Sequence, residues 1–358
     1  AFLASEFHVA FPRARFVPVI GNNDSYCGDY ASTPNSPFLA HMAQAWKTAV
    51  AAPDANAWAA QFATGGYYSL PLPIAGAQAV VLNDVFWSAK YANHCGEASA
   101  DPGGDELTWL RRTLSQNTAH RPVWVIGHIP VGVDVFSTLM KGMQGSGDVT
   151  MMLADPYNAA LIALLGDPRL NVVMSIVGHT HMNAFRVLGP DASHPVAPML
   201  LVPSISPVYN NNPAFTIADV DPQGAGIEDE RVFVLQDLSL LAKGGKRPAE
   251  WGREYDFGSV FGHGALDAAH LDGVEHTMFD DERVRMRFEE YYDSESGRAP
   301  ITEATWRAYW CGNVALTATS FAACAMPQIQ RPLPAQPTAP PAPPTQSPSP
   351  APSPSGSP

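Results

Sequence analysis

The sequence has little positive charge. Its 358 residues carry 21 lysines and arginines against 34 aspartates and glutamates, a formal net charge of −13 at pH 7. Proteins that bind nucleic acids need a basic surface to neutralise the phosphates of the polymer. The composition therefore argues against a nucleic-acid polymer as partner. It does not exclude a small phosphate ester, because a bound cation inverts the local potential.

Long apolar runs and closely spaced cysteine pairs are also missing. No apolar stretch reaches the roughly 20 residues that a membrane-spanning helix needs, and no signal peptide is visible in the sequence. The cysteines are Cys27, Cys95, Cys311 and Cys324, and none forms a Cys-x-x-Cys pair. Zinc-finger and thioredoxin-like sites are therefore disfavoured. An even count fits two disulfides, for which three pairings exist, and four reduced core cysteines are the alternative.

Composition divides the chain into three parts, and its length fits two domains or one large one. Residues 1–245 alternate short runs rich in valine and isoleucine with amphipathic segments, which is typical of an α/β domain with strands covered on both faces. The predicted strands are Phe16–Ile20, Ala79–Leu82, Val123–Ile126, Val172–Val177, Met199–Val202, Phe215–Val220 and Val232–Leu235. Helices are expected to begin at Ser36, Asp105 and Asp155.

The remaining residues differ in character from this core. Residues 246–326 contain charged segments with helical spacing, such as Asp280–Glu290, and predict a small helical subdomain. Residues 327–358 are almost all proline, alanine, serine, threonine and glutamine. Such a segment cannot bury enough apolar surface to fold, so it predicts a disordered tail. A spacer is the default role for this tail, with a glycosylated stalk or an SH3-type ligand as alternatives.

Three apolar runs end in the same way, on a glycine followed by a side chain that can bind a metal ion. The three exits are Gly21-Asn22, Gly127-His128 and Gly178-His179-Thr180-His181. Taken singly, a histidine at a strand end is more often a hydrogen-bonded structural residue, and a run of glycine, asparagine and aspartate is a turn. A preference for turns does not explain why three separate apolar runs all end on a glycine followed by a possible metal ligand. Imidazole with oxygen ligands suits zinc, iron or manganese, so these exits predict a metal site.

In this order, the three exits resemble the motifs of the calcineurin-like metallophosphoesterases and, more closely, of the acid sphingomyelinase-like phosphodiesterases. Weaker matches lie at Leu82-Asn83, Asp105–Leu114 and Pro203-Ser204, and the resemblance covers roughly residues 1–326. It implies a two-sheet β-sandwich of metallophosphoesterase type, flanked by helices. It further implies a dinuclear metal centre in which one ion is bound by Asn22, His128 and His179, and the other by His181.

Two departures from the family pattern affect the chemistry. The family's Asn-His pair reads Asn22-Asn23 here. In the family that histidine protonates the leaving group. Asn23 can donate a hydrogen bond there but no proton, and a nearby histidine such as His94 is the alternative proton source. The family's Asp-x-His and Gly-Asp motifs, which supply the other metal ligands, are not found. Because Ala1–Phe7 resembles the end of the second of these motifs, with Ser5 where relatives carry histidine, we expect that an N-terminal segment is missing. A degenerate homologue is the alternative.

The resemblance implies hydrolysis of a phosphodiester by a hydroxide that bridges two divalent metal ions, with zinc favoured over manganese or iron. The substrate would be a phospholipid of the sphingomyelin type or a soluble nucleotide or choline diester. Two other functions compete with this one. The first is a phosphomonoesterase of the same superfamily, and the second is a catalytically incomplete, secreted scaffold module.

The resemblance also bears on the cysteines. Cys311 and Cys324 lie in one short segment, as in the family, which favours their pairing and that of Cys27 with Cys95. Two disulfides imply a secreted, periplasmic or otherwise oxidising compartment. The sequence does not predict the oligomeric state.

Overall fold

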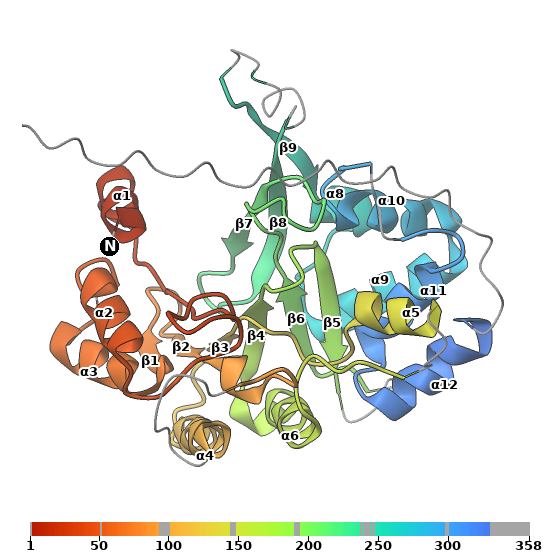
Figure 1. Ribbon diagram of the computed structural model, residues 1–358. Coiled ribbons are helices and arrows are strands. Elements are labelled where there is room, and N and C mark those ends of the chain that lie inside the picture. Colours follow the sequence, from red (N-terminus) through yellow and green to blue (C-terminus); the bar gives the residue numbers. More distant parts are fainter. Residues whose placement is uncertain are drawn as a thin grey trace, which may run out of the picture.

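The chain folds into a mixed α/β structure with two sheets (Figure 1). The computed structural model describes residues 2–50, 52–92, 101–143, 148–189, 194–236, 238, 244, 248–297 and 301–329. The expected partner cysteine, Cys95, and most of the expected tail lie outside these residues. In the described part of the chain, no helix is long and apolar enough to cross a membrane.

The larger sheet has six strands in the order β1-β2-β3-β4-β6-β5. Its strands are β1 (Tyr68–Pro71), β2 (Gln78–Val81), β3 (Val123–Ile126), β4 (Val172–Val177), β5 (Ala184–Leu188) and β6 (Ala197–Leu201). The four inner strands β2, β3, β4 and β6 are parallel, while β1 and β5 run antiparallel at the two edges. The carboxyl ends of the inner strands therefore meet at one edge, where open α/β sheets place their ligands.

The smaller sheet is an antiparallel meander of three strands. It consists of β7 (Ala214–Val220), β8 (Ile227–Leu235) and β9 (Trp251–Asp256). The indole N–H of Trp124 on β3 donates to the carbonyl of Ala225, in the turn between β7 and β8, at 2.8 Å. This bond links the two sheets through a residue buried between them.

Helices cover the two faces of the larger sheet and form a separate core on each (Figure 1). The first core is completed by α2 (Pro37–Trp46), α3 (Ala55–Gly65), α4 (Pro102–Ser115) and α6 (Asp155–Leu165). The second contains the smaller sheet together with α5 (Val135–Met143), α8 (Phe257–Phe261), α9 (Ala268–Asp280), α10 (Glu282–Tyr292), α11 (Trp306–Val314) and α12 (Ala318–Ile329). Successive strand residues face opposite cores, as Trp124 and Val125 do. That is why these strands read as continuous apolar runs.

Six of the seven predicted strands are confirmed within a few residues, and Phe16–Ile20 is wrong. That segment is assigned to no strand. Pro18 at its centre has no N–H to donate to a ladder, and its carbonyl accepts the hydroxyl of Tyr68 at 2.8 Å instead. The helices predicted at Ser36 and Asp155 are confirmed, and the one predicted at Asp105 begins three residues earlier, behind the cap Asp101.

Several elements were not predicted. Strand β5 was missed because Arg186 interrupts its apolar run, although this arginine is buried. Strand β9 was missed because Gly252, Arg253 and Glu254 make it polar, so residues 246–326 contribute a strand as well as helices. The N-terminal α1 (Phe2–Ala10) and the short β1 were also missed. Helix α12 continues to Ile329, which corrects the predicted start of the disordered tail at residue 327.

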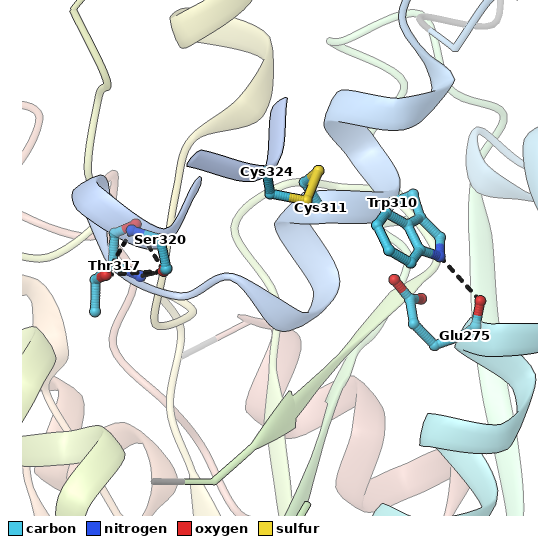
Figure 2. Close-up of a disulfide and its surroundings, with 6 residues drawn as sticks. All are labelled: Glu275, Trp310, Cys311, Thr317, Ser320 and Cys324. Carbon is cyan, nitrogen blue, oxygen red and sulfur yellow. Dashed lines mark hydrogen bonds between the residues drawn. A yellow bond between two sulfur atoms is a disulfide. The ribbon is translucent and has the colours of Figure 1, made fainter. Parts of the chain in front are cut away.

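The expected disulfide between Cys311 and Cys324 is confirmed and joins α11 to α12 (Figure 2). Beside it, the indole N–H of Trp310 donates to the backbone carbonyl of Glu275 at 2.9 Å, which ties α11 to α9. Cys27 is also disulfide-bonded. The pairing of Cys27 with Cys95 stays a prediction, since Cys95 is outside the described residues.

Candidate metal centre

Three of the four predicted ligands converge at the carboxyl edge of the larger sheet. The carboxamide oxygen of Asn22 lies 2.8 Å from Nε2 of His128 and 3.1 Å from Nδ1 of His179, and the two imidazole nitrogens are 3.2 Å apart. These side chains come from positions 22, 128 and 179. The fold thus brings three lone-pair-bearing atoms together in a small triangle.

Two of the three glycines before the ligands are closely packed against a neighbouring side chain. A Cβ at Gly127 would lie 2.3 Å from Oδ2 of Asp84, and one at Gly21 would lie 3.1 Å from the ring of His128. Neither glycine adopts the left-handed backbone conformation. Close packing in the site therefore accounts for Gly21 and Gly127, whereas a Cβ at Gly178 would make an ordinary contact with His128 at 3.7 Å.

The triangle has the dimensions of a metal-ligand set. Ligand atoms about 2.0–2.1 Å from one divalent ion lie roughly 2.8–3.4 Å from each other in octahedral or tetrahedral coordination. The observed sides of 2.8, 3.1 and 3.2 Å match this range. Among the residues described by the structure, no three histidine, cysteine, aspartate or glutamate side chains form such a group. The third corner is therefore the amide oxygen of Asn22, as the sequence predicted.

Asp29 fixes the direction of the Asn22 amide. The Nδ2 group of Asn22 donates to Oδ1 of Asp29 at 2.6 Å. An amide held in this way can present only its oxygen to the two imidazoles, and Asn22 is itself buried. Asp29 therefore selects the acceptor end of Asn22 for the site, which is the end that a metal ion binds.

Tyr30 holds the other nitrogen of His179. Its hydroxyl lies 3.2 Å from Nε2, and its ring contacts the imidazole edge-on. When the Tyr30 oxygen accepts the Nε2 proton, Nδ1 is left without a proton and faces the triangle. The backbone N–H of Tyr30 also donates to the carbonyl of Asn22 at 2.9 Å. One loop thus delivers Asn22 and the partners that orient both Asn22 and His179.

Asp84 supports the loop that carries His128. This fully buried carboxylate follows β2 and accepts the backbone N–H groups of His128 at 2.7 Å and Ile129 at 3.0 Å, both through Oδ2. Burial raises the pKa of Asp84 to about 7, against the lowering effect of these bonds. The contact fixes the His128 backbone at the exit of β3.

His181 lies apart from the triangle. Its Nδ1 is 3.2 Å from the carbonyl of Ser206, and its ring meets that of Tyr209 edge-on with centroids 4.8 Å apart. Its charge contributes to lowering the pKa values of both His128 and His179, so it lies near them. His181 therefore borders the site on the side of the loop between β6 and β7.

Both histidines of the Gly-His-Thr-His turn adopt a left-handed backbone. The φ angles are 68° for His179 and 65° for His181. This region costs a non-glycine residue roughly 1–2 kcal/mol, and such strain persists where the surrounding structure imposes it, often at functional sites.

The electrostatics keep the imidazoles neutral. Burial lowers the pKa of His128 to about 4, with a further contribution from His181. Burial also lowers the pKa of His179 to about 3, helped by His128 and Lys90. The pKa of His181 is lowered by burial as well. Neutral imidazole is the form that binds a metal ion, so all three rings are ready to do so at neutral pH.

The amino-acid sequence is similar to several characterised proteins, although no family model matches it. It is 28% identical over 264 residues to "Sphingomyelinase phosphodiesterase D" of Dictyostelium discoideum, covering 72% of this chain and 55% of that protein. It is 23% identical over 339 residues to the human "Acid sphingomyelinase-like phosphodiesterase 3b", covering 91% of this chain and 70% of that protein. A third relative, "Sphingomyelinase phosphodiesterase C" of the same Dictyostelium species, is 27% identical over 68% of the chain and 53% of its own length.

The chain is a homologue of the acid sphingomyelinase-like phosphodiesterases. It spans about half the length of both Dictyostelium relatives. The resemblance seen in the three strand exits is thereby confirmed, and the triangle of Asn22, His128 and His179 lies on those exits.

The sequence did not reveal the residues that surround the predicted ligands. Asp29 and Tyr30 sit in what reads as a polar loop, and Asp84 follows a weak family match at Leu82-Asn83. Of these three residues, only Asp84 had a signal in the sequence, because it follows the exit of a predicted strand. Asn23 is exposed on the turn after Asn22, and its proposed role as a hydrogen-bond donor stays a prediction. His94 lies outside the described residues.

Proposed function

We propose that this acid sphingomyelinase-like chain is a metal-dependent phosphodiester hydrolase. Asn22, His128 and His179 would hold one divalent ion, with zinc favoured, and His181 would contribute to a second. The convergence of one amide oxygen and two imidazole nitrogens at about 3 Å spacing carries this proposal. The names of the relatives, which are sphingomyelinase-type phosphodiesterases, support a phosphodiester as substrate.

When bound, two such ions supply an activated water and neutralise the charge that develops on the phosphoryl oxygens. The protein's own residues prepare the site for this. Asp29 turns the oxygen of Asn22 inward, the Tyr30 hydroxyl holds Nε2 of His179, and Asp84 anchors His128. A site that is oriented before the ligand arrives needs little reorganisation during the reaction.

Two further side chains have roles in the proposed reaction. Lys90 lies close enough to His179 to lower its pKa, and its ammonium group is 5.5 Å from the centroid of the Tyr30 ring. This cation would attract the phosphate anion to a protein that is otherwise acidic. Asn23 would donate a hydrogen bond to the leaving oxygen but no proton. Diesters with good leaving groups are therefore favoured.

The proposal extends to the fold and the compartment. We assign the two sheets to the metallophosphoesterase sandwich, since they share a core through Trp124 and Leu200 on one side and Val232 on the other. The disulfides at Cys27 and Cys311–Cys324 fit an oxidising or secretory compartment.

Calorimetric titration of the 358-residue chain with Zn²⁺ tests the proposal. One site of moderate affinity is expected, and His128→Ala and His179→Ala should each abolish it. His276→Ala is the matched control, because His276 is an exposed histidine on α9, away from the triangle. Absence of Zn²⁺ binding, or binding that survives His128→Ala, would contradict the proposed centre.

Hydrolysis assays separate the rival functions. Weak turnover is expected, because only His181 has been identified for a second ion, and bis-p-nitrophenyl phosphate should be cleaved faster than p-nitrophenyl phosphate. The reverse preference would identify a phosphomonoesterase. Zn²⁺ binding without turnover of either ester would favour the non-catalytic scaffold module.

A further inference from the structure

A small cavity in the second core has a wall of aromatic rings and one carboxylate. Strands β5, β6, β8 and β9 and helices α8 and α10 all contribute residues to it. Most of the described residues that line it are phenylalanine or tyrosine, and Glu230 on β8 is the only one among them with a charged side chain. The cavity has a volume of about 20 Å³. Since roughly 10–15 Å³ suffices for one water molecule, one particle of that size fits inside.

The Glu230 carboxylate is buried and has no partner among the described residues. Glu230 is 9% exposed and lies on the same face of β8 as the buried Val232 and Val234. Burial and the nearby Asp229 carboxylate both raise its pKa, and no cation or hydrogen-bond donor opposes them. A buried carboxylate without a counter-charge costs free energy once it ionises, because it has lost its shell of water. The cavity beside Glu230 is therefore a place where a cation would be stabilised.

The rest of the wall suits a cation that carries N–H donors. The faces of aromatic rings attract cations, and Tyr255 and Tyr291 lie stacked with their ring centroids 4.3 Å apart. Asn183 donates through Nδ2 to the carbonyl of Tyr291 at 3.0 Å and to the hydroxyl of Ser294 at 3.3 Å, so its carboxamide oxygen remains as an acceptor. A potassium ion is instead bound by a full ring of oxygen atoms, which a largely aromatic wall does not provide.

We propose that this cavity binds an ammonium ion, with the Glu230 carboxylate as its counter-charge and the aromatic rings as its enclosure. The ion is about the size of a water molecule, which the volume admits, whereas a trimethylammonium group is several times larger. The cavity shares no lining residue with the triangle of Asn22, His128 and His179. The ammonium site is therefore separate from the candidate metal centre and does not depend on the proposed function. Its occupation stabilises the folded state, since only the folded chain forms the cavity.

Calorimetric unfolding at pH 8 in the presence of EDTA tests this site while the candidate metal centre is kept free of metal. Glu230 is ionised at this pH, because its pKa is about 7. For the unchanged chain, the melting temperature should be about 2–4 °C higher in ammonium chloride than in sodium chloride, each at about 0.2 M. Glu230→Gln should abolish this difference, because it keeps the shape of the side chain but not its charge. Glu228→Gln should retain the difference, because Glu228 is exposed on the same strand.

Two further salts check the size and the chemistry of the ligand. Tetramethylammonium chloride and potassium chloride should both act like sodium chloride, the first because its cation is too large and the second because its cation donates no N–H. Equal stabilisation by tetramethylammonium would show that the ion acts at the surface, and equal stabilisation by potassium would show that no N–H donor is needed. Either result overturns the proposal. It is also overturned if ammonium and sodium give the same melting temperature, or if Glu230→Gln retains the difference between them.

Discussion

At the scale of single residues, the site depends on side chains that orient the ligands. Tyr30→Phe removes the hydroxyl that holds Nε2 of His179. Loss of such a partner typically weakens metal binding by about 10- to 100-fold, so we expect this decrease in Zn²⁺ affinity by calorimetry. Tyr26→Phe is the control, because Tyr26 lies on the same loop but is exposed and packs against Phe38. Equal affinities of Tyr30→Phe and the unchanged chain would show that Tyr30 does not orient His179.

A second residue-scale prediction concerns pH and the buried Glu230 on β8. Burial, with a smaller effect from Asp229, raises the pKa of Glu230 to about 7. Because the folded state then holds a proton that the unfolded state releases above about pH 4.3, Glu230 makes stability fall as pH rises from about 4.3 to 7. Glu230→Gln should remove that loss. The free energy of unfolding of the variant, relative to that of the unchanged chain, should be about 2–4 kcal/mol more favourable at pH 8 than at pH 5.

Thermal or urea unfolding of the Glu230→Gln variant and the unchanged chain at pH 5 and pH 8 measures this difference. Glu228→Gln is a suitable control, since Glu228 lies on the same strand and is exposed. The histidines act in the opposite direction, because His128 and His179 have lowered pKa values and make stability fall as pH drops below about 6.5. A stability difference that does not change between pH 5 and pH 8 would refute the assignment for Glu230.

At the scale of elements, the turn after β3 depends on a missing side chain. In Gly127→Ala the new Cβ would meet the Asp84 carboxylate at 2.3 Å, and Asp84 is fully buried. The carboxylate cannot move without leaving the N–H groups of His128 and Ile129 unpaired. We expect a destabilisation of about 2–4 kcal/mol, together with weaker Zn²⁺ binding.

Urea unfolding measures the stability of Gly127→Ala. Gly273→Ala on α9 is the control, because a Cβ there would meet nothing within 4 Å and alanine favours helix. It should be neutral or stabilising. If both substitutions leave the unfolding curve unchanged, the close approach of Gly127 to Asp84 has no energetic role.

At the scale of the whole molecule, the folded part has two cores on the two faces of one sheet, and both are closed by helices. The composition of residues 331–358 offers neither core an apolar partner. Deleting these residues is therefore expected to leave the melting temperature within about 1 °C of the full chain, as measured by calorimetry. A drop of several degrees would show that the segment packs on the fold.

Much of the fold followed from local pattern. The valine and isoleucine runs predicted β2, β3, β4 and β6, because strands buried on both faces must be apolar throughout. They also predicted β7 and β8, which alternate buried and more exposed residues. Strand β5, which was missed, depends on a distant partner, and the wrongly predicted strand has a local cause. Arg186 is tolerated in β5 because Asn313 on α11 accepts its guanidinium at 3.0 Å. Phe16–Ile20 fails as a strand because Pro18 lacks the N–H of a ladder.

For the site, the sequence by itself determined which side chains can bind a metal ion and that their loops follow strand ends. Asn22, His128 and His179 were identified from this design, since a glycine and a ligand after an apolar run is a local signal. Only the tertiary structure decided that Asp29, Tyr30 and Asp84 orient these ligands, and that His181 stands apart beside Ser206. Their roles arise from directed hydrogen bonds, several of them between residues far apart in the chain. The spacing of residues along the sequence does not reveal these directions, because the bonds form only once the sheet has brought the loops together.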